Sequence, residues 1–439
     1  MLETVKNAFK DKEIRKRLLF TLLMLIIIRI GAELPIPGVN RDYFSNWFAD
    51  QLSSDSFSML DAFTGGSFEN MSILALNITP YITSSIIIQL LTIAIPKLEE
   101  IQEEGEEGRK ILTNITRYVT IALALVESLA MAIGFGRQGL LEDYNAKNVI
   151  ICVAVLTAGS AFLMWLGERI TESGVGNGIS IVLTINIISR MPQDITSLFS
   201  QFVSGKTIAW GILNTAIIVA VIAGMTFLVL LLNDAERRIP VSYARKINGR
   251  SQLGSGSSVL PLKVNTAGVM PIIFASSIMS FPVIISTLAG YNGTGWWSEA
   301  LRYLSSTYWC NPSYPKYTLG LVVYILLLIF FAYFYTSITF NPLLIADNLK
   351  KSGGFIPGIR PGQPTSDYLQ KILNYIIFIG ACMLIIVAVI PYLFHGLLNT
   401  DASSFGGTSL IIVVSVVLET LKQIESMLQV KNYKSFLID

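Results

Sequence analysis

The chain is 439 residues long, with 52% apolar residues, 14% charged residues and a formal net charge of +2 at pH 7. This excess of apolar residues excludes an ordinary soluble globular protein and is typical of a polytopic membrane protein. A single histidine argues against a histidine-based metal site. The three cysteines, Cys152, Cys310 and Cys382, form neither a disulfide framework nor a metal-binding spacing. We therefore expect no metal and no cofactor.

Apolar stretches long enough to cross a membrane recur along the whole chain. A bilayer core about 30 Å thick requires about 20 helical residues, and a helix satisfies its own backbone hydrogen bonds in lipid. We predict an all-α membrane protein with ten transmembrane helices, near residues 18–36, 71–95, 115–134, 149–166, 179–192, 211–232, 267–289, 318–342, 372–392 and 408–428. Few charges lie inside these stretches, so a path between the helices would be lined mainly by apolar side chains.

The ends of the chain carry the first topological signal. Residues 1–17 are basic and amphipathic, which predicts a helix lying on the membrane surface. A full-length span follows and no small-residue cleavage site is apparent, so a removable signal peptide is not expected. Most of the 32 lysines and arginines fall on the side of the membrane that this first segment would occupy. Because positive charge marks the cytoplasmic side, we expect residues 1–17 and the tail 429–439 to be cytoplasmic.

The segment 53–70, between the first two spans, is too short and too polar to cross the membrane. Residues 56–63 could form a short helix that Gly65 and Gly66 would end. The segment is either an ordered surface loop or a small helix that folds back into a cavity.

The second predicted span is irregular, because polar residues such as Asn77 and Ser84 alternate with isoleucines and Pro80 should bend the helix. Small and hydroxyl residues allow close helix packing, but the same residues could line a pore. The fifth span, which begins with GVGNGIS (174–180), and the tenth are short. Short spans in both halves of a chain are typical of an inverted repeat with a functional site between the halves. We expect halves at 18–192 and 211–428, joined by an external hinge at 193–210.

Two cytoplasmic loops, 233–266 and 343–371, carry more positive charge than a connection between two spans requires. Control of topology alone would explain this charge. It would also attract anionic lipid or an anionic partner such as ribosomal RNA. The turn residues of PGIRPG (357–362) predict a shaped tip, so we favour a docking surface.

Signatures of energy conversion and of catalysis are missing from the sequence. It contains neither a phosphate-binding P-loop nor the H-E-x-x-H motif of zinc proteases. GSGSS (254–258) has no histidine partner and suits a linker better than a nucleophile. We therefore predict that the protein is not an enzyme and that another molecule supplies any energy it uses.

Several segments in a characteristic order closely resemble the SecY family, the channel subunits of the bacterial preprotein translocase. The resemblance extends from the basic start to about residue 430. It is carried by LPIPG (34–38), ITPYITSSIIIQLL (78–91), GVGNGIS (174–180), ERRIPVSYARK (236–246), LPLKVNTAGVMP (260–271), ADNLKKSG (346–353), PGIRPG (357–362) and GGTSL (406–410).

The resemblance implies an hourglass channel of two pseudo-symmetric inverted five-helix halves. A short plug helix at about 56–66 would close the channel from outside, with Phe57, Leu60, Phe63, Gly65 and Gly66. An apolar ring would form the waist, from Ile78, Ile82, Leu183, Ile187, Ile278 and Ile412. A lateral gate between spans two and three and spans seven and eight would include Gln89, Glu127 and Ser277. The family usually has a neutral amide where Glu127 falls.

The resemblance also implies the partners and the activity. The channel would move unfolded secretory polypeptides across the bacterial plasma membrane and release signal sequences and transmembrane segments sideways among the membrane lipids. SecE and SecG would be companion subunits, and the SecA motor ATPase or the ribosome would supply the energy. The candidate contacts for these cytoplasmic partners are Arg245, Lys246, Arg250, Lys350, Lys351 and Arg360.

Two alternatives stand beside this interpretation. A secondary transporter of a small solute would need convergent polar groups at mid-membrane, and the available Asn77, Gln89, Glu127 and Asn186 are scattered along the sequence. An insertase or assembly scaffold would share the membrane fold without conducting a chain to the outside.

Overall fold

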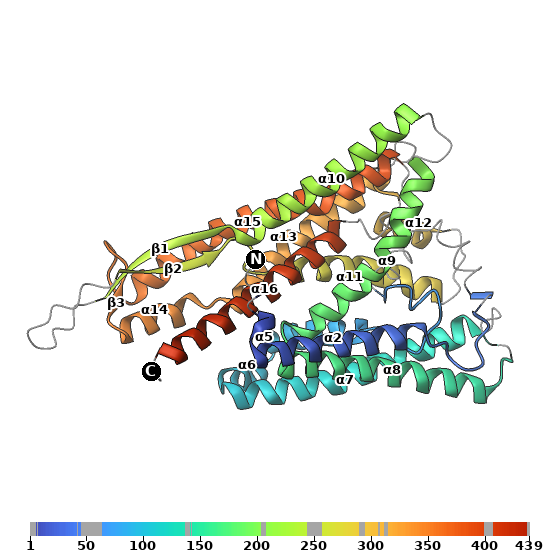
Figure 1. The fold of residues 1–439 in the computed structure, drawn as a ribbon, viewed down its shortest axis with the longest axis horizontal. Helices are drawn as coiled ribbons and strands as arrows, with labels where there is room; N and C mark the ends of the chain where they lie inside the picture. The colour runs from blue at the N-terminus through green and yellow to red at the C-terminus, as the bar shows by residue number, and fades with distance from the viewer. Residues whose placement is uncertain are drawn as a thin grey trace, which may run out of the picture.

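The computed structural model describes residues 6, 8–41, 43–44, 64–136, 141, 143–202, 208–243, 257–288, 295–305, 308–310, 315–398 and 407–436. The molecule is mostly helical and elongated, with long helices running roughly along its long axis (Figure 1). A small β-sheet lies at one end (left in Figure 1), and the short helix α12 lies towards the other.

One group of helices comes from the N-terminal part of the chain. Its members are α2 (Lys12–Glu33), α5 (Thr79–Ala94), α6 (Pro96–Glu103), α7 (Glu106–Gly134), α8 (Ala146–Ser173) and α9 (Gly178–Phe202). Asp11 caps α2, because its Oδ1 accepts hydrogen bonds from the backbone N–H groups of Glu13 and Ile14. Helix α8 packs against α2, α7 and α9, and α5 packs against α7 (Figure 1).

A second group comes from the C-terminal part. It comprises α10 (Ile208–Asp234), α11 (Met270–Leu288), α12 (Trp296–Leu304), the 3-10 helix η3 (Pro315–Thr318), α13 (Leu319–Thr339), α14 (Pro342–Lys351), α15 (Gln363–Leu398) and α16 (Gly407–Phe436). Helix α13 packs between α11 and α15, and α16 packs against α10 and α15. The two groups meet where α9 contacts α10 and α16 and where α7 contacts α11.

Parts of the two basic loops fold together into a three-stranded antiparallel sheet. Strand β1 (Glu236–Tyr243) pairs with β2 (Ser257–Lys263) on one side and with β3 (Gly354–Phe355) on the other. Alternate residues of β1, Ile239 and Val241, are buried while Arg238 and Pro240 are exposed. Ile239 belongs to an apolar cluster that includes Leu369 and Ile376 of α15, so the sheet is anchored on that helix.

Helices long and apolar enough to cross a membrane are found in both groups. Within the described ranges there are five, Glu106–Gly134, Ala146–Ser173, Trp210–Asp234, Pro315–Lys351 and Gln363–Leu393. A sixth is added if the bent pair Thr79–Ala94 and Pro96–Gln102 forms one span. Expected spans also fall on α2, α9, α11 and α16, which do not meet both conditions. The chain is a multi-pass membrane protein, and the count of ten remains a prediction.

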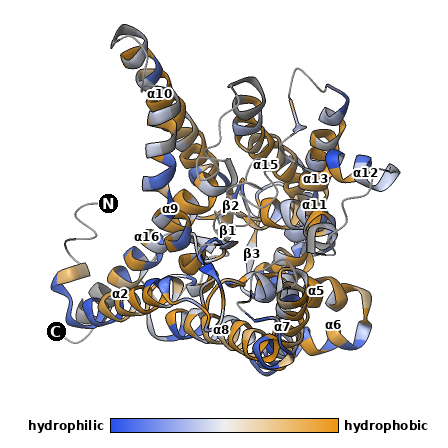
Figure 2. Cartoon of the chain, turned by 90° about the vertical axis from the view of Figure 1, so that its right-hand side faces the viewer, coloured by the Kyte–Doolittle hydropathy of each residue, from blue (hydrophilic) through white to orange (hydrophobic). Residues whose placement is uncertain are grey.

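The surface of the helices agrees with a lipid environment. Apolar residues run along both groups of helices when the molecule is seen end-on (Figure 2). Large apolar side chains such as Ile150, Ile212, Phe227 and Leu326 are exposed. Exposed apolar surface of this extent marks contact with a membrane or a partner.

One predicted bend was misplaced, and one expected boundary overlaps a helix. Pro80 does not bend the second span, because it lies in the first turn of α5, where its missing N–H costs no helical hydrogen bond. The sharp bend, of 107°, lies instead at the break before Pro96. Helix α9 continues to Phe202 with Pro192 inside it, so the expected hinge at 193–210 overlaps helical residues.

Candidate functional site

The candidate site begins with a large buried apolar cluster to which both groups of helices contribute. Four of the predicted ring residues are buried members of this cluster, Ile78, Leu183, Ile187 and Ile412. Ile82 is partly buried and packs against it. Ile78 directly precedes α5, Leu183 and Ile187 lie on α9, and Ile412 lies on α16. Segments distant in sequence therefore deliver branched aliphatic side chains to one apolar region.

The sixth predicted ring residue, Ile278 of α11, has a different environment. Its side chain is 44% exposed and is not part of the cluster. Ile273, on the same helix, is buried in the cluster. Five residues correspond to about 140° around an α-helix, so the two side chains point to different faces. The sequence analysis missed Ile273 because isoleucines recur along α11 and no periodicity selects one of them.

The segment 64–78, which leads into α5, packs closely against α9. Gly65 has φ +66°, and a Cβ atom there would lie 2.7 Å from the backbone oxygen of Asn186. The carbonyl oxygen of Gly65 accepts a hydrogen bond from Ser189 Oγ at 3.4 Å and another from Arg29 Nη1 at 3.3 Å. Only glycine fits this conformation and this close approach without strain.

Asn77 holds the other end of the segment. It has φ +51°, and its side-chain Oδ1 accepts a hydrogen bond from Asn186 Nδ2 at 3.1 Å. Its backbone oxygen accepts one from Ser160 Oγ of α8 at 3.2 Å. Ser84, one turn into α5, is buried and donates to the backbone oxygen of Pro80. Of the two interpretations of the polar residues in this span, Asn77 and Ser84 therefore favour close packing.

Charged groups tie the same segment to the middle of α9. Glu69 lies 3.4 Å from Arg190, which also lies 3.9 Å from Asp194 one turn further along α9. Arg41 Nη2 donates a hydrogen bond to the side-chain oxygen of Asn70. Burial raises the pKa of the Glu69 carboxyl, and the positive charge of Arg41 partly opposes this.

The helices of the predicted lateral gate are paired as expected. α5 packs against α7, α11 packs against α13, and α7 touches α11. Gln89 donates to Ser85 Oγ at 3.4 Å, while its buried Oε1 has no hydrogen-bond partner among the described residues. Glu127 of α7 and Ser277 of α11 are half-buried. These three gate residues stay predictions.

The predicted docking and plug residues are described only in part. Arg245, Lys246 and Arg250 of the docking set, and Phe57, Leu60 and Phe63 of the plug, lie outside the described residues.

The described docking residues are all exposed near the sheet. Lys350 and Lys351 end α14, and Arg360 lies in PGIRPG. Two glycines of that motif, Gly358 and Gly362, have positive φ, and the Arg360 backbone oxygen accepts a hydrogen bond from Thr365 Oγ1. The motif therefore forms a structured turn.

A helical fold with several apolar helices and a buried apolar cluster shared by its two helix groups defines the class of multi-pass membrane proteins. The SecY family model matches residues 72–421. The protein translocase subunit SecY of Streptomyces scabiei is 42% identical over 452 residues, with 100% of both chains covered. The chain belongs to the SecY family, whose members are protein-translocation channels rather than enzymes.

Solved structures agree with this assignment at the level of the fold. A structure described as that of a protein-conducting channel matches with a TM-score of 0.62 and 17% identity, covering 94% of this chain and 92% of the other. Sec61 in the canine ribosome-channel complex matches with a TM-score of 0.55 and 16% identity, with the same coverage. The transporter alternative is not favoured by these similarities.

Proposed function

We propose that the chain forms the pore through which unfolded polypeptides cross the membrane, with the apolar cluster as its seal. The observation that carries this proposal is the joint burial of Ile78, Leu183, Ile187 and Ile412 beside the segment 64–78. From α11 we propose Ile273 as a ring residue, either beside Ile278 or in its place.

The chemistry of the ring suits a client of arbitrary sequence. Hydrogen-bonding or charged groups in the path would retain some client sequences more than others. Branched aliphatic side chains have no preferred polar partner, so they can yield around any polypeptide, and when closed they hinder ions by dewetting. Selection of a client would then depend on its partner and its targeting segment rather than on the ring.

The proposed architecture has ten transmembrane helices in two inverted halves, 18–192 and 211–428. The halves would consist of α2, α5, α7, α8 and α9 and of α10, α11, α13, α15 and α16, joined by the hinge at 193–210. The packing of each group within itself, with contacts between the groups through α9 and α7, supports this division. The plug, at about 56–66, would rest on α9 through Gly65.

The proposed lateral gate opens between α7 and α11. Burial of apolar surface in lipid is worth about 25 cal/mol per Å², so an apolar client segment that samples the open gate gains free energy by leaving sideways. Signal sequences and transmembrane segments would be sorted by this partition equilibrium. The half-buried Glu127 and Ser277 would be the polar groups between α7 and α11 at this gate.

The proposed partners act on the cytoplasmic side of a bacterial plasma membrane, where both termini would also lie. The similarity to a ribosome-bound channel supports the ribosome as one partner. SecA would be the motor for finished preproteins, with SecE and SecG as companion subunits. Exposed Lys350, Lys351 and Arg360 beside the sheet offer positive charge for an anionic surface.

Cross-linking of a stalled secretory chain tests the proposal directly. Benzoylphenylalanine in place of Ile82 or Ile273 should form an adduct with the stalled chain, because both positions would face the path. The same group in place of Ile150, which is exposed on the outside of α8, is the control and should form none. Absence of adducts at both ring positions, with an intact complex, would contradict a conducting pore and favour an insertase or scaffold.

A further inference from the structure

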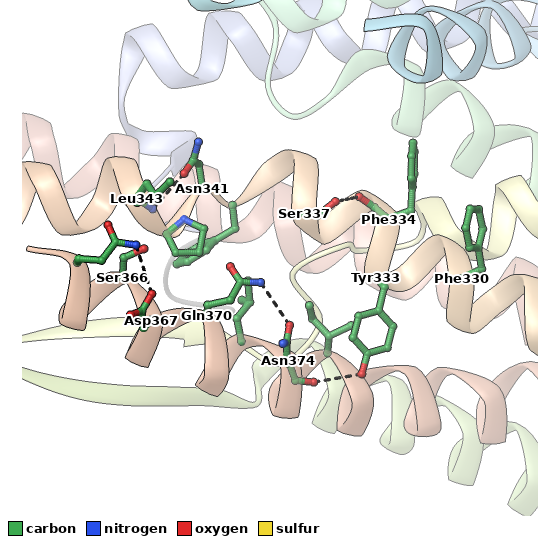
Figure 3. Close-up of a pocket in the computed structure, with 15 residues that line it drawn as sticks. Phe330, Tyr333, Phe334, Ser337, Asn341, Leu343, Ser366, Asp367, Gln370 and Asn374 are labelled. Carbon is green, nitrogen blue, oxygen red and sulfur yellow. Dashed lines mark hydrogen bonds between the residues drawn. The ribbon is translucent and has the colours of Figure 1, made fainter. Parts of the chain in front are cut away.

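A cavity of about 830 Å³ lies between the end of α13, the start of α14 and the first four turns of α15 (Figure 3). The cavity lining contains none of the proposed ring residues, although Phe334 in its wall also packs against the apolar cluster. Its volume falls within the range of about 300–1,000 Å³ that is common for small-molecule sites. Neither the proposed pore nor the docking turn uses these side chains.

The walls of the cavity become more apolar along its length. Asn341, Ser366 and Asp367 lie at one end, Gln370 and Asn374 lie in the middle, and Phe330 and Phe334 of α13 lie at the other end (Figure 3). Buried Leu373 and Ile377 of α15 also line the wall. Phe330 is 57% exposed, so the apolar end opens onto the lipid-facing surface of the helices. This gradient matches an amphiphile whose polar group faces the sheet end of the molecule.

The polar end carries one charge. Among the described residues that line the cavity, Asp367 is the only ionisable side chain other than the phenol of Tyr333, and none is a lysine or an arginine. The Asp367 carboxylate is exposed and accepts a hydrogen bond of 3.4 Å from Gln363 Nε2. The aromatic rings of Phe334 and Phe340 add faces that attract cations. The charge of the site is therefore complementary to a cationic group.

Among the remaining polar groups are side-chain amides that can form further hydrogen bonds. Gln370 Nε2 donates to Asn374 Oδ1 at 3.5 Å, and the Asn374 backbone oxygen accepts from the Tyr333 hydroxyl at 3.3 Å. A primary amide has two N–H donors and an acceptor oxygen, so the side chains of Gln370 and Asn374 can also bind phosphate or ester oxygens.

We propose that this cavity binds a phospholipid with an amine headgroup, such as phosphatidylethanolamine. The ammonium group pairs with Asp367, the phosphate and ester oxygens take amide donors from Gln370 and Asn374, and an acyl chain lies against Leu373, Ile377 and Phe330. A purely anionic headgroup meets the Asp367 carboxylate without a compensating cation, which makes it the poorer ligand.

Lipid retention measured by native mass spectrometry tests the site. The full chain, purified with its associated subunits, is incubated with phosphatidylethanolamine or phosphatidylglycerol that have the same acyl chains. The parent protein should retain phosphatidylethanolamine in preference. Asp367→Asn should weaken that retention about five-fold, the value of a partly exposed charge pair, and should leave phosphatidylglycerol retention no lower. Asp347→Asn, the same charge change on exposed α14 outside the cavity, is the control and should retain both lipids like the parent.

Equal retention of phosphatidylethanolamine by Asp367→Asn and the parent, or a preference of the parent for phosphatidylglycerol, would overturn the proposal. A second measurement identifies the occupant without relying on affinity. Benzoylphenylalanine in place of Ser337, in the cavity wall, should cross-link to lipid in native membranes. Cross-linking to a polypeptide instead would show that a cationic protein segment fills the cavity, and would also overturn the proposal.

Discussion

Asn186 of α9 and Asn77 at the start of α5 are joined by a hydrogen bond of 3.1 Å between Nδ2 and Oδ1, and both side chains are buried. The same turn of α9 carries the backbone oxygen on which Gly65 rests. One site on α9 therefore holds both ends of the segment that separates the proposed plug from the proposed ring. If this segment keeps the pore closed, small changes in its contacts should be measurable as ion leak.

Asn186→Leu removes the side-chain hydrogen bond while keeping a similar volume. Loss of a buried hydrogen-bond partner costs about 1–3 kcal/mol, so we expect the segment to be released more often and the resting conductance of reconstituted bilayers to rise several-fold. Asn348→Leu, on the exposed face of α14, should leave the conductance unchanged. Equal resting conductance of the two variants would show that this hydrogen bond does not keep the pore closed.

Two adjacent glycines provide a matched pair for the close approach to α9. Gly65 and Gly66 both have positive φ, so an alanine at either position costs about 1 kcal/mol in backbone strain. At Gly65 the new methyl group would also meet Asn186 backbone atoms at 2.7 and 2.8 Å, whereas at Gly66 the nearest atom is 4.0 Å away. Gly65→Ala should therefore leak more and unfold at a lower temperature than Gly66→Ala. Indistinguishable variants would contradict the contact.

The position of α11 in the ring is tested by two isoleucines on different faces. Ile273→Asn places an amide in the buried cluster, at a cost of about 1–3 kcal/mol, and should raise the resting conductance. Ile278→Asn changes a side chain that is already 44% exposed and should have a smaller effect. The reverse order would restore Ile278 as the ring residue. The double replacement of Ile78 and Ile82 by asparagine is the positive control.

Much of this arrangement could be read from the sequence, because long apolar runs and ordered motifs report helices and family. The features that could not be predicted from the sequence were local. The position of Pro80 in a first turn depends on the turns formed by residues 64–78, which hydropathy does not reveal. Ile273 could not be distinguished from Ile278 in a helix that has isoleucines at several positions. The alternation in ERRIPVSY (236–243) was visible, but its pairing with Gly354–Phe355 joins residues over a hundred positions apart.

The turn PGIRPG (357–362), which carries Arg360 near the sheet, should contribute to partner binding rather than to the stability of the fold. Arg360 is exposed, and its backbone, not its side chain, accepts the hydrogen bond from Thr365. Arg360→Glu should therefore leave the melting temperature unchanged and reduce motor- or ribosome-dependent transport, because it reverses a charge facing an anionic surface. Lys147→Glu, an equal charge change at an exposed position of α8 outside both basic loops, is the control. Normal transport by Arg360→Glu would remove this residue from the docking surface.

The half-buried carboxyl of Glu69 should make closure depend on pH. The pKa of Glu69 is raised, mainly by burial, while the segment 64–78 is packed against α9. The packed state therefore binds a proton more tightly than a released state in which Glu69 is exposed. Protonation of Glu69 therefore stabilises the packed segment at low pH, and this stabilisation is lost as the pH rises through the raised pKa. We expect less leak at pH 5 than at pH 7.5 in the parent protein. In Glu69→Gln, which cannot titrate, this difference should disappear. A leak that increases on acidification, or an unchanged pH dependence in Glu69→Gln, would assign the effect to another group.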